Sequence, residues 1–369
     1  MEKLWKYKKI GEVCIVERGA SPRPIDKYIT DNESGINWIK IGDTSDSMYI
    51  TETAQKIIVE GMKKSRYVKP GDFLLSNSMS FGRPYILKID GCIHDGWLVL
   101  RDENALFDKR FLYYYLSSKT TYKKLKSMAV GGVVNNLNSE MVRNVIVPVP
   151  DKEEQSEIAD LFDKIKKILD DRKQELEQLD TLVKSRFVEM FGDIITGKYN
   201  YKIRKLGDVA FIGSSHRVFT TEFVESGIPF YRGTEIGELA NGIEPSEPYY
   251  ISEEHYNKLT KNNTKPRIGD LLMPSICNKG QIWMVDTDRP FYYKDGRVLC
   301  ISPNRDIFNS KYLEYFMRIK TLVEYPKLGS GSTFAEFKIF LLKDMDVLVP
   351  PRNVQNQFAD FVASVDKSK

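Results

Sequence analysis

Hydrophobic positions follow two different rhythms along this chain. Between Asp151 and Phe191, apolar side chains recur every three or four residues, which is the spacing of one face of a helix. On either side of this stretch, short β-branched and aromatic runs such as 71–75 and 96–100 are separated by Gly, Pro, Asn and Asp. That pattern is typical of strands joined by turns. We therefore expect one long helix between two strand-rich regions.

The long helix has a recognisable start and a single apolar stripe. Asp151 is suited to cap its N-terminus, and Glu154 three residues later completes a capping-box pattern. About 40 helical residues would extend roughly 60 Å, at about 1.5 Å per residue. Only Arg172 interrupts the stripe, and one such helix cannot bury its own apolar face, so it needs a partner helix from this chain or from another protein. The subunit-interface candidates are Ile158, Leu161, Phe162, Ile165, Leu169, Leu176, Leu179, Val183 and Phe187.

The two strand-rich regions repeat one another in order. The pair Asp95-Gly96 recurs as Asp295-Gly296, and the other matched segments keep an offset between 191 and 201 residues. Chance similarity of short motifs would not keep this colinear order, so we infer that one scaffold is duplicated and carries two different sets of loops. The matched segments include 10–13 with 206–209, 70–75 with 268–272, 110–115 with 311–316, and 149–161 with 349–361.

Each copy is expected to hold one helix and to end in an extended segment. The helices are predicted around 108–117 and 309–318, and the extended ends at 145–150 and 346–351, where prolines disfavour helix. The second copy begins the same long helix near residue 353 but reaches less than half its length. Either this end is naturally short or it has been shortened, in which case a partner helix would come from elsewhere.

Charge and composition narrow the class of protein. The 369 residues, 41% of them hydrophobic, suffice for about two domains with real cores. The net charge of +4 is uneven: the stretch 151–189 holds 12 acidic and 8 basic residues, which leaves about +8 for the rest and fits contact with a polyanion. No run approaches 18 apolar residues, and the charged start lacks an apolar signal core. We therefore expect a cytoplasmic protein with no membrane contact.

Signatures of a self-contained enzyme are missing. The four cysteines are scattered and read as reduced buried thiols, and the three histidines lie outside any HExxH, so no metal site is predicted. Gly192 to Lys198 fits GxxxxGK, but Tyr199 follows and a helix precedes it, so a helix end with a linker is the favoured interpretation. No GxGxxG, GxSxG or Asn/Asp-Pro-Pro-Tyr/Phe run supplies a cofactor or catalytic motif.

The doubled motifs resemble a known family over nearly the whole chain. Val149-Pro150 followed by 151–159, its counterpart 349–359, and the helix end 182–192 look like type I restriction-modification specificity subunits. The resemblance implies an α+β fold with a pseudo-two-fold internal repeat. Its target-recognition domains of mixed sheet and helices would lie at 1–150 and 193–350. A long coiled-coil-like spacer at 151–192 would join them, with a truncated second spacer at 351–369.

The same resemblance implies a division of labour. Each recognition domain would read one half of a bipartite site on double-stranded DNA. The spacers would bind two methyltransferase subunits, and motor-nuclease restriction subunits could join the complex. S-adenosylmethionine would belong to the methyltransferase that modifies adenine N6, and this chain would hold no cofactor and no catalytic residue. Two alternatives remain: a coiled-coil scaffold that binds no DNA, or the recognition part of another restriction-modification type.

Polar loops at matching positions of the two copies are the candidate DNA contacts. Hydroxyl and amide groups suit base edges, Arg suits guanine or phosphate, and Lys neutralises phosphates. An ordinary polar turn is the alternative for each loop, and Trp38, Trp97 and Trp283 are expected in the core rather than stacked on bases. The candidate DNA-binding residues are Arg18, Ser21, Arg23, Ser76, Asn77, Ser78, Ser80, Arg83, Lys123, Lys124, Lys126, Asn135, Asn136, Ser215, His216, Arg217, Ser275, Asn278, Lys279, Gln281, Ser330, Ser332 and Thr333.

Overall fold

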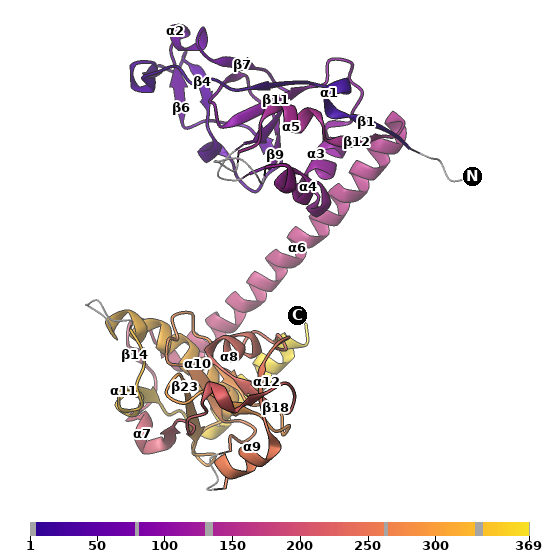
Figure 1. Ribbon diagram of the computed structural model, residues 1–369. Helices are drawn as coiled ribbons and strands as arrows, with labels where there is room; N and C mark the ends of the chain where they lie inside the picture. The colour runs from indigo at the N-terminus through magenta and orange to yellow at the C-terminus, as the bar shows by residue number, and fades with distance from the viewer. Residues whose placement is uncertain (1–4, 78–80, 130–135, 262–264, 329–334, 369) are drawn as a thin grey trace. The chain divides into compact units, whose positions relative to one another are not determined.

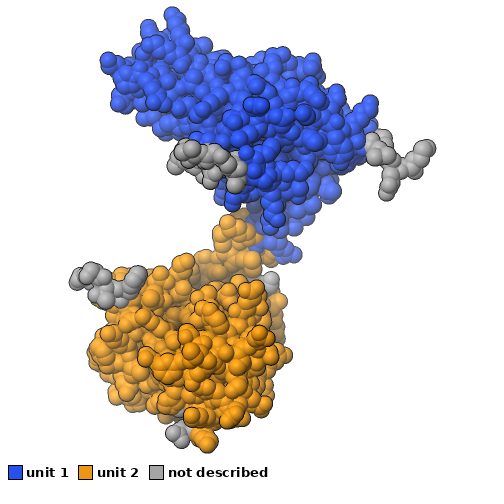
Figure 2. Space-filling view, viewed as in Figure 1, with its two compact units in different colours: residues 1–172 blue, residues 173–369 orange. Residues whose placement is uncertain are grey.

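The chain divides into two compact units, residues 1–172 and 173–369 (Figures 1 and 2). The structure, a computed structural model, describes residues 5–77, 81–129, 136–261, 265–328 and 335–368. Helix α6 (Lys152–Phe191) begins in unit 1 and ends in unit 2. Among the described residues, no helix combines the length and the apolar character needed to cross a membrane.

Unit 1 is built around a five-stranded sheet in the order β2-β11-β8-β9-β5. Strand β11 lies between β2 and β8 and runs antiparallel to both, and its first residues pair with the last residues of these neighbours: Leu98 with Arg18, and Trp97 with Ser76. Strands β2 and β8 therefore end on the same side of the sheet on which β11 begins. We call this row of strand ends the edge of the unit. The strands are β2 (Ile15–Arg18), β11 (Trp97–Arg101), β8 (Phe73–Ser76), β9 (Pro84–Leu87) and β5 (Tyr49–Ile50).

A second five-stranded sheet and a short ribbon complete the strands of unit 1. The second sheet has the order β3-β6-β4-β10-β7, with β4 and β10 parallel, and β1 pairs with β12. These strands are β3 (Ile29–Thr30), β6 (Gln55–Ile57), β4 (Ile36–Ile39), β10 (Gly91–Ile93), β7 (Arg66–Val68), β1 (Lys6–Lys9) and β12 (Ile146–Val149).

Alternation of side chains along β11 divides the core of unit 1 into two layers. Trp97 and Val99 pack with Ile39 and other residues of the second sheet, whereas Leu98 packs with Phe111 and other residues of the helices. Successive side chains of a strand point to opposite faces, so one continuous apolar run fills both layers. Tryptophans 38, 97 and 283 are all buried, which confirms their predicted place in the core.

Unit 2 also has two sheets and a short ribbon, but each of its sheets has four strands where that of unit 1 has five. Its main sheet has the order β16-β23-β20-β21 and its second sheet β17-β19-β18-β22, while β15 pairs with β24. Strand β23 lies between β16 and β20 and runs antiparallel to both. It pairs Val298 with Pro274 and Cys300 with Gly213. The strands are β16 (Ala210–Gly213), β23 (Val298–Pro303), β20 (Leu271–Pro274), β21 (Trp283–Met284), β17 (Phe223–Val224), β19 (Tyr249–Ile251), β18 (Ile228–Tyr231), β22 (Tyr292–Tyr293), β15 (Ile203–Lys205) and β24 (Asp346–Leu348).

The structure holds more helices than the sequence pattern indicated. Helices α3 (Lys109–Ser117) and α10 (Ser310–Glu324) confirm the two predicted near residues 108 and 309, but the expectation of one helix per copy was wrong. Most of the additional helices have four to seven residues, too short for a helical periodicity to stand out. They are α1 (Ile10–Val13), α2 (Val59–Met62), α4 (Lys119–Ala129), α5 (Ser139–Arg143), α7 (Leu206–Val209), α8 (Gly233–Leu239), α9 (Glu253–Leu259) and α11 (Ile339–Lys343). Helix α12 (Arg352–Asp366) confirms the helix predicted to begin near residue 353.

Helix α6 begins and ends close to the predicted residues. The Asp151 carboxylate accepts a 3.0 Å hydrogen bond from the backbone N–H of Glu154, as a cap should. The Glu154 carboxylate accepts from the Trp5 indole at 2.8 Å, a contact that the capping-box pattern did not predict. The helix stops before Gly192, whose φ of +93° suits glycine, and a short hairpin of β13 (Gly192–Asp193) and β14 (Lys198–Tyr199) follows.

All four cysteines are buried and unbridged. Burial raises the pKa of Cys92 and Cys277 to about 11, and that of Cys14 and Cys300 to about 12. The thiolate is the reactive form of cysteine, so these thiols are inert while the protein is folded.

Candidate nucleic-acid interface

Four separate segments of unit 1 converge at the edge where β11 begins. The backbone N–H of Gly19 donates to the Trp97 carbonyl at 2.9 Å, and that of Asn77 donates to the Gly96 carbonyl at 2.9 Å. Leu137, nearly 60 residues further along, donates its N–H to the Asn77 carbonyl at 3.0 Å. Backbone bonds therefore hold Gly19, Asn77 and Leu137, which lie in or next to three of the predicted polar segments, close to one turn.

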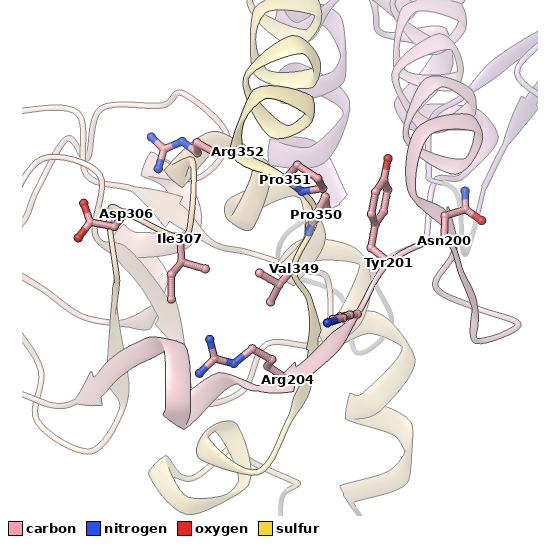
Figure 3. Close-up of a pocket in the computed structure, with 10 residues that line it drawn as sticks. Asn200, Tyr201, Arg204, Asp306, Ile307, Val349, Pro350, Pro351 and Arg352 are labelled. Atoms are coloured by element: carbon pink, nitrogen blue, oxygen red, sulfur yellow. The ribbon is translucent and has the colours of Figure 1, made fainter.

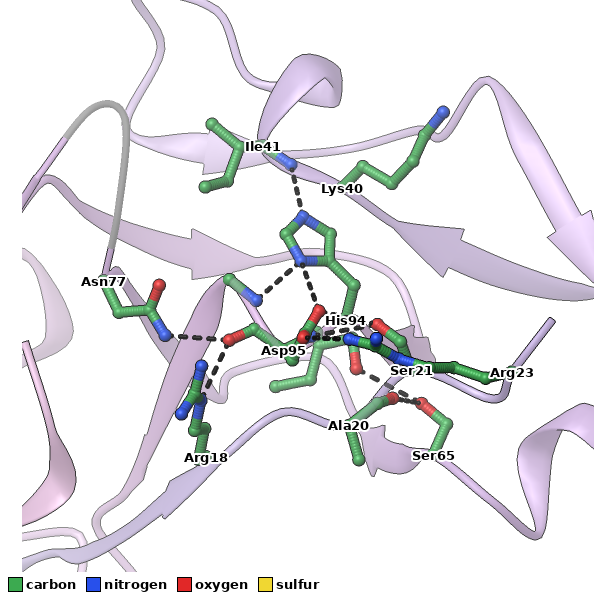
Figure 4. Close-up of polar contacts among 12 residues, drawn as sticks. Arg18, Ala20, Ser21, Arg23, Lys40, Ile41, Ser65, Asn77, His94 and Asp95 are labelled. Atoms are coloured by element: carbon green, nitrogen blue, oxygen red, sulfur yellow. Dashed lines mark hydrogen bonds and ion pairs between the residues drawn. The ribbon is translucent and has the colours of Figure 1, made fainter. Parts of the chain in front are cut away.

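Asp95 is the centre of this convergence (Figure 4). Its carboxylate accepts from the Ser21 hydroxyl at 2.8 Å and from the Arg23 guanidinium at 3.3 Å. Its backbone carbonyl accepts from Arg18 Nε at 3.1 Å and from the Asn77 side-chain amide at 2.8 Å. The hydrogen bond from Ser21 is the main cause that lowers the pKa of Asp95, so the carboxylate is charged at neutral pH.

His94 supports the same turn from behind. Its Nδ1 lies 2.7 Å from the backbone N–H of Gly96, and its Nε2 lies 3.2 Å from that of Ile41. The ring is flanked by Trp38 and Trp97, each with its ring centroid at 6.3 Å. Burial lowers the pKa of His94 and so favours the neutral ring, which accepts a hydrogen bond at one of its two nitrogens, whereas the charged ring accepts none.

Unit 2 builds the corresponding edge with different side chains. The Ser214 hydroxyl accepts from the backbone N–H of Gly296 at 2.9 Å and donates to the Val298 carbonyl at 3.0 Å. Ser275 donates its backbone N–H to Arg297, and its carbonyl accepts from the N–H of Phe337, at 2.8 and 2.7 Å. The backbone frame of unit 1, in which residues 77, 96 and 137 are joined, therefore recurs here.

An arginine binds the turn carboxylate in unit 2 as well. Arg217 Nε lies 3.2 Å from Asp295 Oδ2, and Lys294 Nζ lies 3.6 Å from Asp295 Oδ1. The Arg217 side chain is 67% exposed, while that of Asp295 is only 17% exposed. The edge of each unit thus presents a guanidinium to solvent beside a carboxylate that is held in place.

Further cations flank the edge of unit 1. Arg83 is exposed and lies 3.8 Å from Asp46, too far for a strong ion pair. Helix α4 carries Lys123, Lys124 and Lys126 on its exposed side. Exposed lysines along a helix are suited to neutralise phosphates, as the sequence predicted.

The predicted DNA-binding residues divide by exposure. Ser76, Asn77 and Ser275 are buried, so they shape the edge and cannot face a ligand directly. The Ser21 hydroxyl donates a hydrogen bond to Asp95, and the Ser215 hydroxyl donates one to the Tyr293 carbonyl. Asn136 is half-buried. The exposed candidates are Arg18, Arg23, Arg83, Lys123, Lys124, Lys126, His216, Arg217, Asn278 and Lys279.

Two of the candidates in unit 2 lie elsewhere, and others are not described. Lys279 and Gln281 line a hollow of about 780 Å³ with residues of α8 and α10, whereas Ser214 and Asp295 lie at the strand edge. Six predicted residues fall outside the described part of the chain: Ser78, Ser80, Asn135, Ser330, Ser332 and Thr333.

Another hollow of unit 2 lies away from the edge. It measures about 680 Å³ beside the β15–β24 ribbon, and it includes Tyr201, Arg204, Asp306 and Arg352 (Figure 3). It shares no residue with the strand edge described above, so it does not belong to the candidate interface.

The most central residues of the interface were missed by the sequence reasoning. Asp95, Asp295 and His94 organise the two turns, yet only the recurrence of the Asp-Gly pair was noticed. That recurrence was the available signal: an acidic residue kept at matching positions while the neighbouring loops differ.

Some residues of the apolar stripe of α6 are buried in the cores of the units, and others are exposed. Val183 and Phe187 are 4% and 1% exposed and lie in the core of unit 2, so they are not available to another subunit. Ile158 and Leu179 are half-buried against the cores of units 1 and 2. The interface candidates that remain on the surface are Leu161, Phe162, Ile165, Leu169 and Leu176, which are 42–64% exposed.

Comparisons with known proteins agree on one family. Residues 2–179 match the family model described as the type I restriction modification DNA specificity domain. The type I restriction enzyme MjaIX specificity subunit of Methanocaldococcus jannaschii is 23% identical, and the alignment covers 98% of this chain and 86% of that protein.

Solved structures agree at the level of the fold. A chain from the structural study of complex assembly and conformational transition of the type I R-M system matches with a TM-score of 0.59 and 18% identity, covering 99% of this chain and 90% of that chain. The type I restriction-modification S subunit from M. genitalium matches with a TM-score of 0.54 and 14% identity, covering 100% and 90%. Residues 2–179 thus match the DNA specificity domain of type I restriction-modification systems, and over 98% of its length the chain is similar to a specificity subunit of such a system, as the motifs in its sequence indicated.

Proposed function

We propose that this chain reads a bipartite site on double-stranded DNA, one half with each unit. The observation that carries the proposal is the convergence of polar loops at one strand edge of each unit, with exposed arginines beside Asp95 and Asp295. Base edges in the major groove are read by side chains held in fixed positions, and phosphates orient the protein. The edges and α4 carry exposed side chains suited to both kinds of contact.

The two units supply the two readers. They share strand orders and a backbone frame, which supports our inference of an internal duplication. We assign recognition to residues 1–150 and 193–350, and spacer roles to 151–192 and to the shorter segment 351–369. The division of the chain into compact units falls within α6, at residue 172.

Catalysis is assigned to partner proteins. We infer that two methyltransferase subunits bind the helical part and that motor-nuclease subunits join for cleavage, with S-adenosylmethionine held by the methyltransferase. The exposed stripe from Leu161 to Leu176 supports this, because an unpartnered apolar face on a helix is typical of a protein contact.

Methylation mapping tests the proposal directly. Host DNA is sequenced for methylated bases in cells with the gene and in cells without it. A gapped two-part motif should be methylated only when the gene is present. If every methylated motif persists after the gene is removed, the proposal fails.

Binding of the assembled complex to DNA provides a second readout. Affinity for random duplex should fall with rising salt, because lysines and arginines release counterions from phosphates. Absent or salt-insensitive binding would favour the scaffold alternative.

A further inference from the structure

The guanidinium of Arg217 is held in one orientation at the edge of unit 2. We propose that Arg217 reads a guanine in the half-site of unit 2 and that Asp295 is the residue that positions it. This inference rests on the proposed function and deepens it by naming a base and the pair of residues that recognises it.

The backbone beneath Arg217 is fixed on both sides. The Ser215 hydroxyl donates to the Tyr293 carbonyl at 2.6 Å, and the His216 N–H donates to the Tyr292 hydroxyl at 2.9 Å. The next residue, Val218, is 2% exposed and packs in a small core. The loop therefore cannot move Arg217 far, although its side chain lies at the surface.

The ion pair fixes the side chain by its inner nitrogen. Arg217 binds Asp295 through Nε, and among the described residues neither terminal amino group of Arg217 has a hydrogen-bond partner. Asp295 is mostly shielded from water, and its partner at the other oxygen, Lys294, neutralises it further. Both terminal amino groups of Arg217 thus remain available to a ligand in solvent.

Two DNA groups match such an end: the O6 and N7 atoms of guanine, and phosphate oxygens. A fixed guanidinium favours guanine, because the bidentate contact with a base edge depends on orientation. A phosphate contact tolerates a mobile cation, for which a free lysine or arginine serves as well. We therefore expect the fixed orientation of Arg217 to increase discrimination between bases.

Unit 1 offers the contrast within the same chain. Arg23 reaches Asp95 with a terminal amino group, so part of its outer end is already occupied. Arg18 instead donates its Nε to the Asp95 carbonyl, at 3.1 Å. The pairing of carboxylate and Nε that leaves a complete outer end belongs to Arg217.

The test uses the complete methyltransferase complex and five variants of this chain: three single variants, the double variant Arg217→Lys/Asp295→Asn, and Arg217→Ala. Arg217→Lys keeps the charge and removes the planar fork, Asp295→Asn keeps the shape and removes the charge, and Arg289→Lys is a matched control at an exposed arginine of the same unit. Methylated motifs are mapped in host DNA, and binding is measured on duplexes with the mapped motif and with 7-deazaguanine at each guanine in turn.

The parental complex should lose affinity at one 7-deazaguanine position of one half-site. Arg217→Lys should reduce discrimination at that same base pair by about 10- to 100-fold, the range expected for one bidentate contact. Asp295→Asn should relax the same position to a smaller extent, and the double variant should add little. The other half-site, the gap and the Arg289→Lys variant should be unchanged.

Other outcomes overturn the inference. If Arg217→Lys leaves the motif intact, then Arg217 does not read a base. If Arg217→Ala weakens binding equally on all sequences, then Arg217 binds phosphate. A parental complex that leaves no gapped motif would instead contradict the proposed function. Arg217 is exposed, so its variants remain informative even if Asp295→Asn impairs folding.

Discussion

The two recognition edges have the same frame and different chemistry. In unit 1 the turn residue Asp95 is backed by His94 and its side chain is 43% exposed, whereas Asp295 in unit 2 follows Lys294 and is 17% exposed. Backbone bonds fix the turn in both units, so the side chains around it can differ without altering the frame. Under the proposed function, the strand ends would determine where each unit meets DNA, and the side chains would determine which DNA groups it recognises.

The attachment of α6 differs in the same way. In unit 1, Arg110 binds Asp160 and Asp163 at 2.7 Å each, and Tyr114 stacks on Phe162. In unit 2, the helix contributes Phe187 and Phe191 to a buried aromatic cluster with Tyr312 and Phe358. The attachment to unit 1 thus includes ion pairs beside its apolar contacts, whereas the aromatic cluster in unit 2 is apolar.

The largest expected effect breaks the apolar attachment. Phe191→Ala removes a fully buried ring and should destabilise unit 2 by about 3–5 kcal/mol. Hydrogen exchange followed by mass spectrometry separates the two units, and protection should fall in unit 2 only. Val188→Ala, at a position that is 47% exposed on the same helix, is the control. Equal loss in both units would contradict the separate cores.

A substitution at Gly19 sharpens the comparison of the two edges. A Cβ on Gly19 would lie 2.0 Å from the His94 carbonyl oxygen, so Gly19→Ala must push the turn away, at a cost of about 1–3 kcal/mol. Binding at the half-site of unit 1 should weaken, with the other half-site unchanged. Gly42→Ala meets nothing within 4 Å and serves as the control. A loss at both half-sites would argue against independent readers.

Removing Arg110 tests the polar attachment. Arg110→Ala should destabilise unit 1 by about 1 kcal/mol at low salt, because its carboxylate partners are 36–55% exposed and water screens the pairs. Urea unfolding with and without 0.5 M salt, about five times the ionic strength at which the Debye length is 10 Å, measures the effect. The difference between the parent and the variant should shrink in salt, and a salt-independent loss would point to packing instead.

Acid should affect the two edges differently, by a few-fold at most. The pKa of His94 is lowered by burial, against the opposing charges of Asp95 and Asp43, so the folded turn disfavours the proton. Stability of the turn is complete above the unfolded value near 6.5 and declines as pH falls below it.

Binding at the half-site of unit 1 should therefore weaken between pH 7 and pH 5.5, as fluorescence anisotropy on half-site duplexes can measure. Unit 2 carries Lys294, not a histidine, directly before its turn carboxylate Asp295. The half-site of unit 2 should accordingly bind no more weakly in acid. His94→Gln should remove the pH dependence of unit 1, and parallel acid responses of both half-sites would contradict the assignment.

Local features of the fold were predictable from local sequence. Periodicity and capping located α6, α3 and α10, and the prolines near residues 148 and 350 marked the exits of the two copies. These signals involve residues a few positions apart, where helix geometry alone relates sequence to structure.

Features that depend on distant partners were not predictable. Arg23 and Asp95 are 72 residues apart, and they meet only because β11 lies between β2 and β8. Asn77 has the composition of a base reader, but a backbone bond to residue 96 buries it. Phe187 follows the apolar stripe like its neighbours, and only the packing of α10 and α12 shows that its partner is internal.

The burial of every native cysteine has a practical consequence. With Cys14, Cys92, Cys277 and Cys300 inert, one cysteine introduced on the surface of each unit would take up a fluorophore selectively. Energy transfer between two such dyes would then report, in solution and on single DNA molecules, how the separation of the two readers changes as a bipartite site is engaged.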